Sequence, residues 1–119
     1  MNHKIKSIRP FIGSKNFGIS RSFYQDLGFE EIVLDSKMSV FKSGETAFYL
    51  QDYYDKNWID NTMIFIEVDD ADRYYKELEA LNLTEKYGVK LTPTRHLDWG
   101  SECFLHDPSG VLWHFGTFK

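Results

Sequence analysis

The sequence predicts an α+β fold in which two modules, each with the element order βαβββ, form a curved mixed sheet that encloses a cavity. The first observation is that apolar residues recur at helical spacing twice, over residues 19–27 and 71–82. The second is that three short strand-like segments follow each helix. The third is a hairpin over residues 98–115, whose turn Asp107-Pro108-Ser109-Gly110 combines a fixed proline φ with a glycine that tolerates positive φ.

The first half of the chain accounts for one module. Residues 5–12 are predicted to be a strand, but Pro10 lacks a ladder donor and belongs at an edge or where the chain changes partner. Residues 13–18 are predicted to form a loop, and the helix over 19–27 ends at Gly28. Three strands follow, near residues 29–35, 38–43 and 46–52.

The second half repeats this order after a polar segment, residues 52–61, that is predicted to be a loop. Residues 63–68 are predicted to be a strand, and Asp69 or Asp70 can cap the helix over residues 71–82. The remaining strands are predicted near residues 88–95, 101–106 and 111–117.

Length and composition limit the function. A chain of 119 residues with 42% hydrophobic and 27% charged residues is expected to form one domain, residues 1–119, with modules at about 5–52 and 62–118. A net charge of −4 without a basic run argues against nucleic acid and mildly favours a neutral or cationic ligand. The aromatic content of 17% leaves rings to spare for a cavity or an interface.

The same composition bears on the cellular setting. No apolar run approaches membrane-spanning length, and the first residues lack the apolar region of a signal peptide. The one cysteine, Cys103, cannot form an internal disulfide and is predicted to be structural. We therefore expect a cytoplasmic protein that has no membrane partner.

Three motifs resemble those of a known superfamily. They are Phe23-Tyr24-Gln25-Asp26-Leu27-Gly28-Phe29 for "FY-x-x-LGF", Phe65-Ile66-Glu67-Val68-Asp69-Asp70 for a mid-chain strand and helix start, and Asp107-Pro108-Ser109-Gly110 for a closing "DP-x-G" turn. In this order they resemble the vicinal-oxygen-chelate superfamily, which includes glyoxalases, extradiol dioxygenases, fosfomycin-resistance enzymes and bleomycin-resistance proteins. The resemblance covers nearly the whole chain and implies the fold rather than one activity, since the superfamily hosts several chemistries.

A finer resemblance is to the bleomycin-resistance branch. Pro10 stands where those proteins have a proline, and Asp60-Asn61-Thr62 precedes the mid-chain strand as it does there. Trp99-Gly100 matches a "WG" whose indole stacks on the drug's flat bithiazole, and Val111-Leu112-Trp113-His114-Phe115 is similar to the last strand. The resemblance implies a homodimer that can exchange its N-terminal strand around Pro10 and shares two ligand grooves between its subunits.

The enzymes of this superfamily bind a divalent metal ion through His, Glu or Gln side chains on the sheet. The resemblance carries the four ligand positions onto Arg9, Tyr49, Met63 and His114. A guanidinium cannot ligate a cation, and a thioether is a poor ligand for a hard or borderline one. We therefore expect no metal, no cofactor and no catalytic residue.

Two further interpretations concern the histidines. A cluster of His96, Glu102 and His114 is conceivable, but its spacing matches no known metal pattern, and His96 is expected to be solvated. His114 alone is predicted to be a satisfied, neutral histidine at the sheet surface. A hydrogen-bonding role for His114 on the cavity floor is the alternative.

Trp99 is the strongest candidate for binding a ligand, because a loop indole can stack on a planar molecule. The alternatives are a core tryptophan or one in a dimer contact, and the flanking Asp98 and Gly100 favour the loop. Because residues two apart in a strand share a face, the other residues expected to line the cavity are Tyr49, Phe65, Met63, Arg9 and His114.

The leading hypothesis is a metal-free, homodimeric protein that sequesters a planar, aromatic antibiotic of the bleomycin type. Two departures put bleomycin itself in question: residues 30–34 hold no second stacking ring, and Arg9 facing a pocket would repel a polycation. The alternatives are a metal-dependent lyase, isomerase or dioxygenase with a displaced ligand set, and a sensor or interaction module with a vestigial cavity.

Overall fold

The computed structural model describes residues 1–119 and confirms the α+β fold with two βαβββ modules. In the first module the strands form a four-stranded sheet in the order β1-β4-β3-β2, in which β1 runs parallel to β4 and the other pairs are antiparallel. The elements of this module are β1 (Phe11–Gly13), α1 (Phe17–Asp26), β2 (Glu30–Asp35), β3 (Met38–Ser43) and β4 (Thr46–Gln51).

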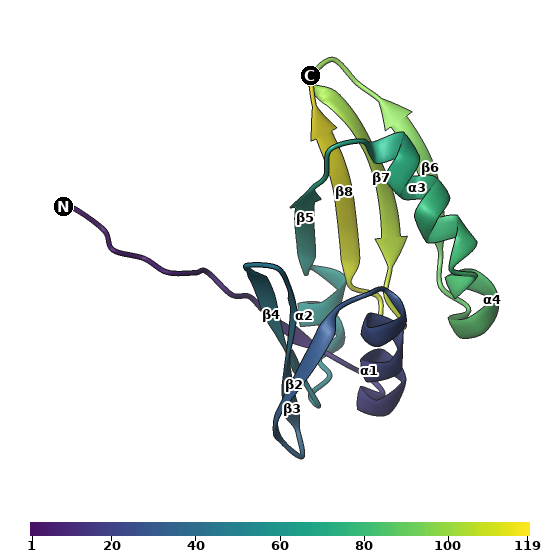
Figure 1. The fold of residues 1–119 in the computed structure, drawn as a ribbon. Helices are drawn as coiled ribbons and strands as arrows, with labels where there is room; N and C mark the ends of the chain where they lie inside the picture. The colour runs from purple at the N-terminus through teal and green to yellow at the C-terminus, as the bar shows by residue number, and fades with distance from the viewer.

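The second module forms its own four-stranded sheet, in the order β5-β8-β7-β6, with β5 parallel to β8. Figure 1 shows α3 lying across β6 and β7, so that one face of this sheet is covered. No helix of the structure is long and apolar enough to cross a bilayer. The elements are α2 (Lys56–Asp60), which connects the modules, then β5 (Met63–Glu67), α3 (Ala71–Ala80), α4 (Leu83–Tyr87), β6 (Leu91–His96), β7 (Gly100–His106) and β8 (Leu112–Phe118).

Side-chain caps explain where the helices begin. Asp70 caps α3, as predicted, by accepting a hydrogen bond from the Arg73 N–H. Asn16 caps α1, which therefore starts at Phe17, inside the segment predicted to be a loop. Asp55 caps α2, so the predicted loop over residues 52–61 contains a short helix.

The predicted helix over residues 71–82 is wrong in its last turn. The helix α3 ends at Ala80, and Asn82 adopts the left-handed conformation, with φ 55° and ψ 36°, before α4 begins. Asparagine is one of the few residues that adopts this conformation at low cost, so the chain turns there instead of continuing the helix.

The predicted strand over residues 5–12 is wrong over residues 5–10, because only Phe11–Gly13 pairs with a neighbour; this strand lies at an edge of the sheet, as predicted. The last hydrogen bond between the preceding segment and the sheet is made by the Pro10 carbonyl, which accepts from the Tyr49 N–H at 2.9 Å. Residues 1–10 have no regular structure and run away from both sheets as an arm (Figure 1). A strand needs a neighbouring strand as its hydrogen-bonding partner, and no strand of this chain pairs with the arm.

The two modules are joined by a buried hydrogen-bond network between α1 and the hairpin that links β7 and β8. The Tyr24 hydroxyl donates to Asp107 Oδ2 at 2.6 Å and accepts from Trp113 Nε1 at 2.9 Å. Asp107 Oδ1 accepts three backbone N–H bonds from the turn, including that of Gly110, whose φ is 108°. The "FY" and "DP-x-G" motifs thus meet in the core, where they hold the two modules together.

Candidate functional site

An exposed cluster of aromatic rings lies on the second sheet. Phe65 of β5, Trp99 in the turn before β7 and Phe118 of β8 have ring centroids 5.4 to 6.2 Å apart. The three residues remain 39% to 55% exposed. We call Phe65, Trp99 and Phe118 the aromatic cluster. The rings are tilted by 38° to 58° to one another and together present an exposed apolar surface on which a ring of a ligand can pack.

Two glycines allow these rings to assemble. A Cβ on Gly116 would lie 2.5 Å from Cζ of Phe65, so the Phe65 ring rests directly on the β8 backbone. A Cβ on Gly100 would lie 2.0 Å from the carbonyl oxygen of Thr117, so β7 approaches β8 closely just after Trp99. The backbone therefore holds Trp99 beside the end of β8.

Next to the aromatic cluster, a buried carboxylate joins two donors. Glu102 of β7 is 7% exposed, and its Oε1 lies 3.0 Å from Nδ1 of His114 on β8. Its Oε2 accepts a hydrogen bond of 3.4 Å from Nη2 of Arg95 on β6. The Arg95 guanidinium lies over the Phe104 ring, with 5.1 Å from Cζ to the centroid. We call Arg95, Glu102 and His114 the polar cluster.

Strand register explains why the two clusters are neighbours. Phe65 pairs with His114 across β5 and β8, and His114 pairs with Phe104 across β8 and β7. Residues opposite one another point to the same face, so these three side chains stand in a row. The ring centroids of Phe65 and His114 are 6.4 Å apart, and those of Phe104 and His114 are 4.8 Å apart.

The aromatic cluster and the polar cluster lie on the face of the second sheet that α3 does not cover. Phe115 and Cys103 point to the helix side, where Phe115 stacks on Tyr74 of α3 with 4.8 Å between centroids. Because successive residues of a strand alternate between faces, His114 and Glu102 point to the opposite side. Burial raises the pKa of the Cys103 thiol to about 11, which fits the structural role predicted for it.

The structure brings together some of the predicted ligand-binding residues and separates others. Phe65, Trp99 and His114 lie together, and Met63 is exposed on the same face of β5 as Phe65. Tyr49 lies on β4 in the other sheet, where it stacks on Phe11 with 4.6 Å between centroids. Arg9 lies on the exposed N-terminal arm.

The sequence reading missed several residues of this face. No pattern in the sequence marks Arg95, Phe104 or Phe118 as part of a site, and the cluster conceivable for Glu102 included His96. Alternation along β7 could have placed Glu102 and Phe104 on one face, but nothing in the chain signals which strand lies opposite.

The cluster of His96, Glu102 and His114 does not form. Nδ1 of His96 lies 2.8 Å from Oγ of Ser101, and its Nε2 lies 3.5 Å from Oδ1 of Asp72 on α3. His96 is therefore on the helix side of the sheet, and only the pair of Glu102 and His114 remains on the open side.

The residues do not fit a divalent metal ion. No three His, Cys, Asp or Glu side chains lie close enough to hold one. Of the four positions carried over from the superfamily's enzymes, His114 and Met63 are on the second sheet, and Tyr49 is on the first. Arg9 precedes β1 on the arm, and its guanidinium has no lone pair to offer.

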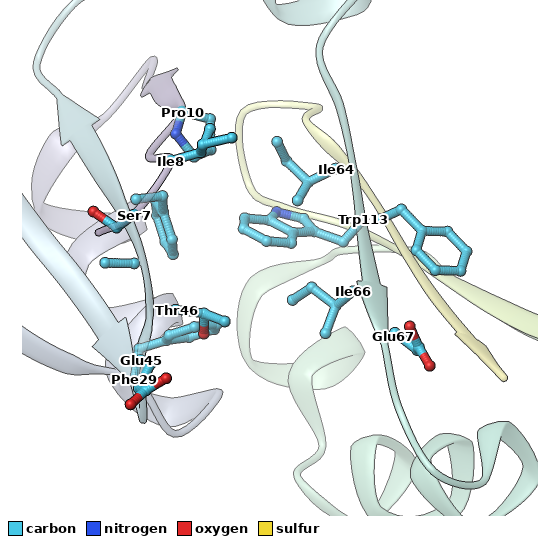
Figure 2. A pocket seen from close by; sticks show the side chains of 13 residues that line it. Ser7, Ile8, Pro10, Phe29, Glu45, Thr46, Ile64, Ile66, Glu67 and Trp113 are labelled. Carbon is cyan, nitrogen blue, oxygen red and sulfur yellow. The ribbon is translucent and has the colours of Figure 1, made fainter. Parts of the chain in front are cut away.

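A cavity of about 440 Å³ lies between the two sheets, beside the arm, and Phe65 of the aromatic cluster is at its edge. Figure 2 shows Trp113, Ile64 and Ile66 of the second module lining one side of the cavity. Ile8 and Pro10 of the arm line the other side. Eight of the 13 lining residues are hydrophobic, and Phe65 is the one predicted ligand-binding residue among them. The cavity is therefore mainly a gap between core side chains at the open edge of β5.

Comparisons with known proteins agree with this architecture. The bleomycin-binding protein from the bleomycin producer Streptomyces verticillus, solved with copper(II)-bleomycin, has a TM-score of 0.82, with 24% identity over 99% of this chain and 100% of that one. A second bleomycin-binding protein, solved with bleomycin, has a TM-score of 0.80, with 18% identity over 97% of this chain and 100% of that one. A lactoylglutathione lyase from Agrobacterium tumefaciens has a TM-score of 0.71, with 16% identity over 97% of this chain and 96% of that one.

At these identities the solved structures establish a common fold and nothing finer. A comparison with curated protein sequences returned no match. The sequence profile of the Glyoxalase/Bleomycin resistance protein/Dioxygenase superfamily matches residues 9–115. The chain therefore belongs to the glyoxalase/bleomycin resistance protein/dioxygenase superfamily.

Proposed function

We propose that this protein binds a planar, aromatic small molecule of the bleomycin type without altering it, in a groove between two copies of the chain. The observation that carries the proposal is the aromatic cluster, whose three rings are 39% to 55% exposed although they touch one another. A planar ligand that stacks there removes both its own apolar surface and that of the rings from water. The likeness to two bleomycin-binding proteins supports this ligand class.

The arm supports the pairing of two copies. Ile5 and Ile8 are 63% and 85% exposed, which is unfavourable for an isolated chain. The outer edge of β5 has no neighbouring strand, and the apolar cavity opens beside it. We propose that the arm of a second copy, turned at Pro10, pairs along this edge and buries its isoleucines there.

The first sheet supplies the other wall of the proposed groove. Phe11 is 49% exposed and stacks on Tyr49, so this pair also presents a flat ring face. In a homodimer, such a face from one copy can stand opposite the aromatic cluster of the other. Met63 and His114 would then lie on the floor between the two walls, and Arg9 at the hinge of the arm. The buried, unpaired Cys103 supports a cytoplasmic setting.

Replacing Trp99 with alanine tests the ligand site. Loss of the indole should weaken the binding of bleomycin, measured by isothermal titration calorimetry, by about 2 kcal/mol, or about 30-fold in Kd. Tyr75→Ala is the matched control, since Tyr75 lies on α3 behind the sheet, and its affinity should stay within about twofold of the parent. Equal affinities of Trp99→Ala and the parent would refute stacking on this indole.

Removing residues 1–9 tests the proposed exchange. The truncated chain should be monomeric by light scattering at a concentration where the full chain is dimeric. A truncated chain that remains a dimer would contradict exchange of the arm while leaving dimerisation itself intact.

A metal-dependent lyase, isomerase or dioxygenase is the second candidate, and one observation favours it. A carboxylate behind the imidazole, as Glu102 is behind His114, is the arrangement that metal-bound histidines usually have. The remaining donors would have to come from a second copy. Elemental analysis of protein purified without chelators decides: a stoichiometric metal that is lost in His114→Ala would support the enzyme, and its absence would leave the binding protein.

A further inference from the structure

We propose that Glu102 determines which hydrogen-bonding role His114 presents to the groove, and that the site thereby selects planar ligands carrying an N–H or O–H donor. The selection of ligands rests on the proposed function, which places the ligand on this face of the second sheet. Glu102 acts through His114, so we regard it as a positioning residue.

The geometry of the pair determines the imidazole tautomer. A carboxylate has no proton to donate, so Nδ1 of His114, 3.0 Å from Oε1 of Glu102, must be the nitrogen that carries the hydrogen. A neutral imidazole has only one N–H, and Nε2 is left with its lone pair. The outer nitrogen of the neutral His114 imidazole is therefore an acceptor.

Glu102 is held in the orientation that this role needs. It is 7% exposed, and its second oxygen, Oε2, accepts from the Arg95 guanidinium at 3.4 Å. The guanidinium is itself positioned over the Phe104 ring. Both oxygens of Glu102 thus meet donors, and the carboxylate cannot rotate away from His114 without leaving a donor unpaired.

The lone pair of His114 is open to a ligand. Nε2 makes no hydrogen bond within the chain, and the only buried side-chain nitrogen or oxygen without a partner is Nδ1 of His106. Nε2 therefore reaches the surface of the groove. With the Phe65 ring centroid 6.4 Å from that of His114, a planar molecule stacked on Phe65 brings its edge to this nitrogen.

The other charged groups of this face favour the same class of ligand. Glu67 follows Phe65 on the exposed face of β5 and also can only accept. The Arg95 guanidinium, which lies over the Phe104 ring, is a cation beside this row that is already paired with Glu102. Nε2 of His114 and the Glu67 carboxylate are therefore acceptors on this face, which a ligand with an N–H or O–H group satisfies and one without such a group leaves unpaired.

Glu102→Gln tests the inference with little change of shape. The Gln side chain must turn its oxygen to Arg95, because two donors would otherwise face each other, and this leaves its NH₂ group toward His114. The NH₂ group donates to Nδ1, so the imidazole hydrogen moves to Nε2. The outer nitrogen changes from an acceptor into a donor.

Nitrogen-15 NMR of the imidazole rings reads this change directly, without a ligand. Spectra are recorded at high pH, on the plateau where the imidazoles are neutral. The parent should show His114 with its proton on Nδ1, and Glu102→Gln should show it on Nε2, with His106 as an internal control. A parent in which Nε2 carries the proton overturns the inference, and this measurement stands even if the variant does not fold.

Fragment binding tests the selection of ligands. The parent should bind indole about tenfold more tightly than benzofuran, which has the same shape and no N–H. Glu102→Gln should lose this preference and instead bind quinoline, a planar acceptor, more tightly than naphthalene. Equal binding of indole and benzofuran by the parent overturns the selection and leaves the proposed function in place. Failure of the parent to bind any fragment, or bleomycin, overturns the proposed function and the selection with it.

Discussion

The hydrogen bonds of Tyr24 are predicted to be a main source of the stability of this fold, and Tyr24→Phe removes them without changing the ring. Tyr24, Asp107 and Trp113 are 0%, 3% and 1% exposed, so no water can replace the lost hydroxyl. The variant leaves Oδ2 of Asp107 and Nε1 of Trp113 buried without a partner. Burial also raises the pKa of Tyr24 well above its ordinary value, so the hydroxyl remains a donor at every practical pH.

The size of the effect follows from the two orphaned groups. A buried donor or acceptor without a partner costs about 1 to 3 kcal/mol, which gives about 3 kcal/mol for the indole and carboxylate together. The unfolding entropy of 119 residues is about 0.25 kcal/mol/K, at about 2.1 cal/mol/K per residue. The melting temperature should therefore fall by about 12 °C.

Urea and thermal unfolding measure this loss, and Tyr75→Phe is the control. The hydroxyl of Tyr75 makes only an exposed hydrogen bond of 3.3 Å to Glu79, so its loss should cost at most about 0.5 kcal/mol. A loss below about 1 kcal/mol in Tyr24→Phe, or one equal to that of the control, would refute the reasoning.

The loss in Tyr24→Phe should also depend on pH. Burial raises the pKa of Asp107, and hydrogen bonds from Tyr24 and from the turn backbone lower it only in part. A folded-state pKa above the unfolded one means that ionisation of Asp107 destabilises the fold as pH rises through this window. Without Tyr24 the carboxylate is less well stabilised, so the variant should lose more stability at pH 7 than at pH 3.

Two further outcomes are expected. Burial alone would raise the pKa of the Glu31 carboxyl. Hydrogen bonds, first among them that from Arg21, outweigh burial and hold the pKa below its ordinary value. This stabilisation is present above the pKa that Glu31 has in the unfolded chain, and it is lost as the pH falls through the pKa of the folded protein. In urea titrations, Glu31→Gln should therefore lower the free energy of unfolding by about 1 kcal/mol at pH 7 and by little at pH 3. Gly116→Ala should displace the Phe65 ring and weaken bleomycin binding by about threefold to tenfold with a small change in melting temperature; unchanged affinity would mean that Phe65 does not touch the ligand.

The sequence by itself determined the order of the strands and of the two longer helices, α1 and α3, but not the short helices α2 and α4. Helical spacing, the cap at Asp70 and the turn at Gly110 depend on residues close in the chain, and the structure contains each of them. The two motifs that meet through Tyr24 and Asp107 also carry the resemblance to the superfamily, to which the chain belongs. Helix spacing, caps and turns depend on residues that are close in the chain, so the sequence alone predicts them.

Only the tertiary structure decided what the open face contains. The pairing of Glu102 with His114 depends on the register between β7 and β8, and a slip of one residue would turn either side chain to the helix side. The meeting of Phe65 and Trp99 depends on β5 lying beside β8, although 44 residues (68–111) separate β5 from β8 in the chain. The arm shows the same limit. Residues 5–12 have the alternation of a strand, but a strand also needs a neighbour to pair with, and only the folded structure shows that most of this segment has none within the chain.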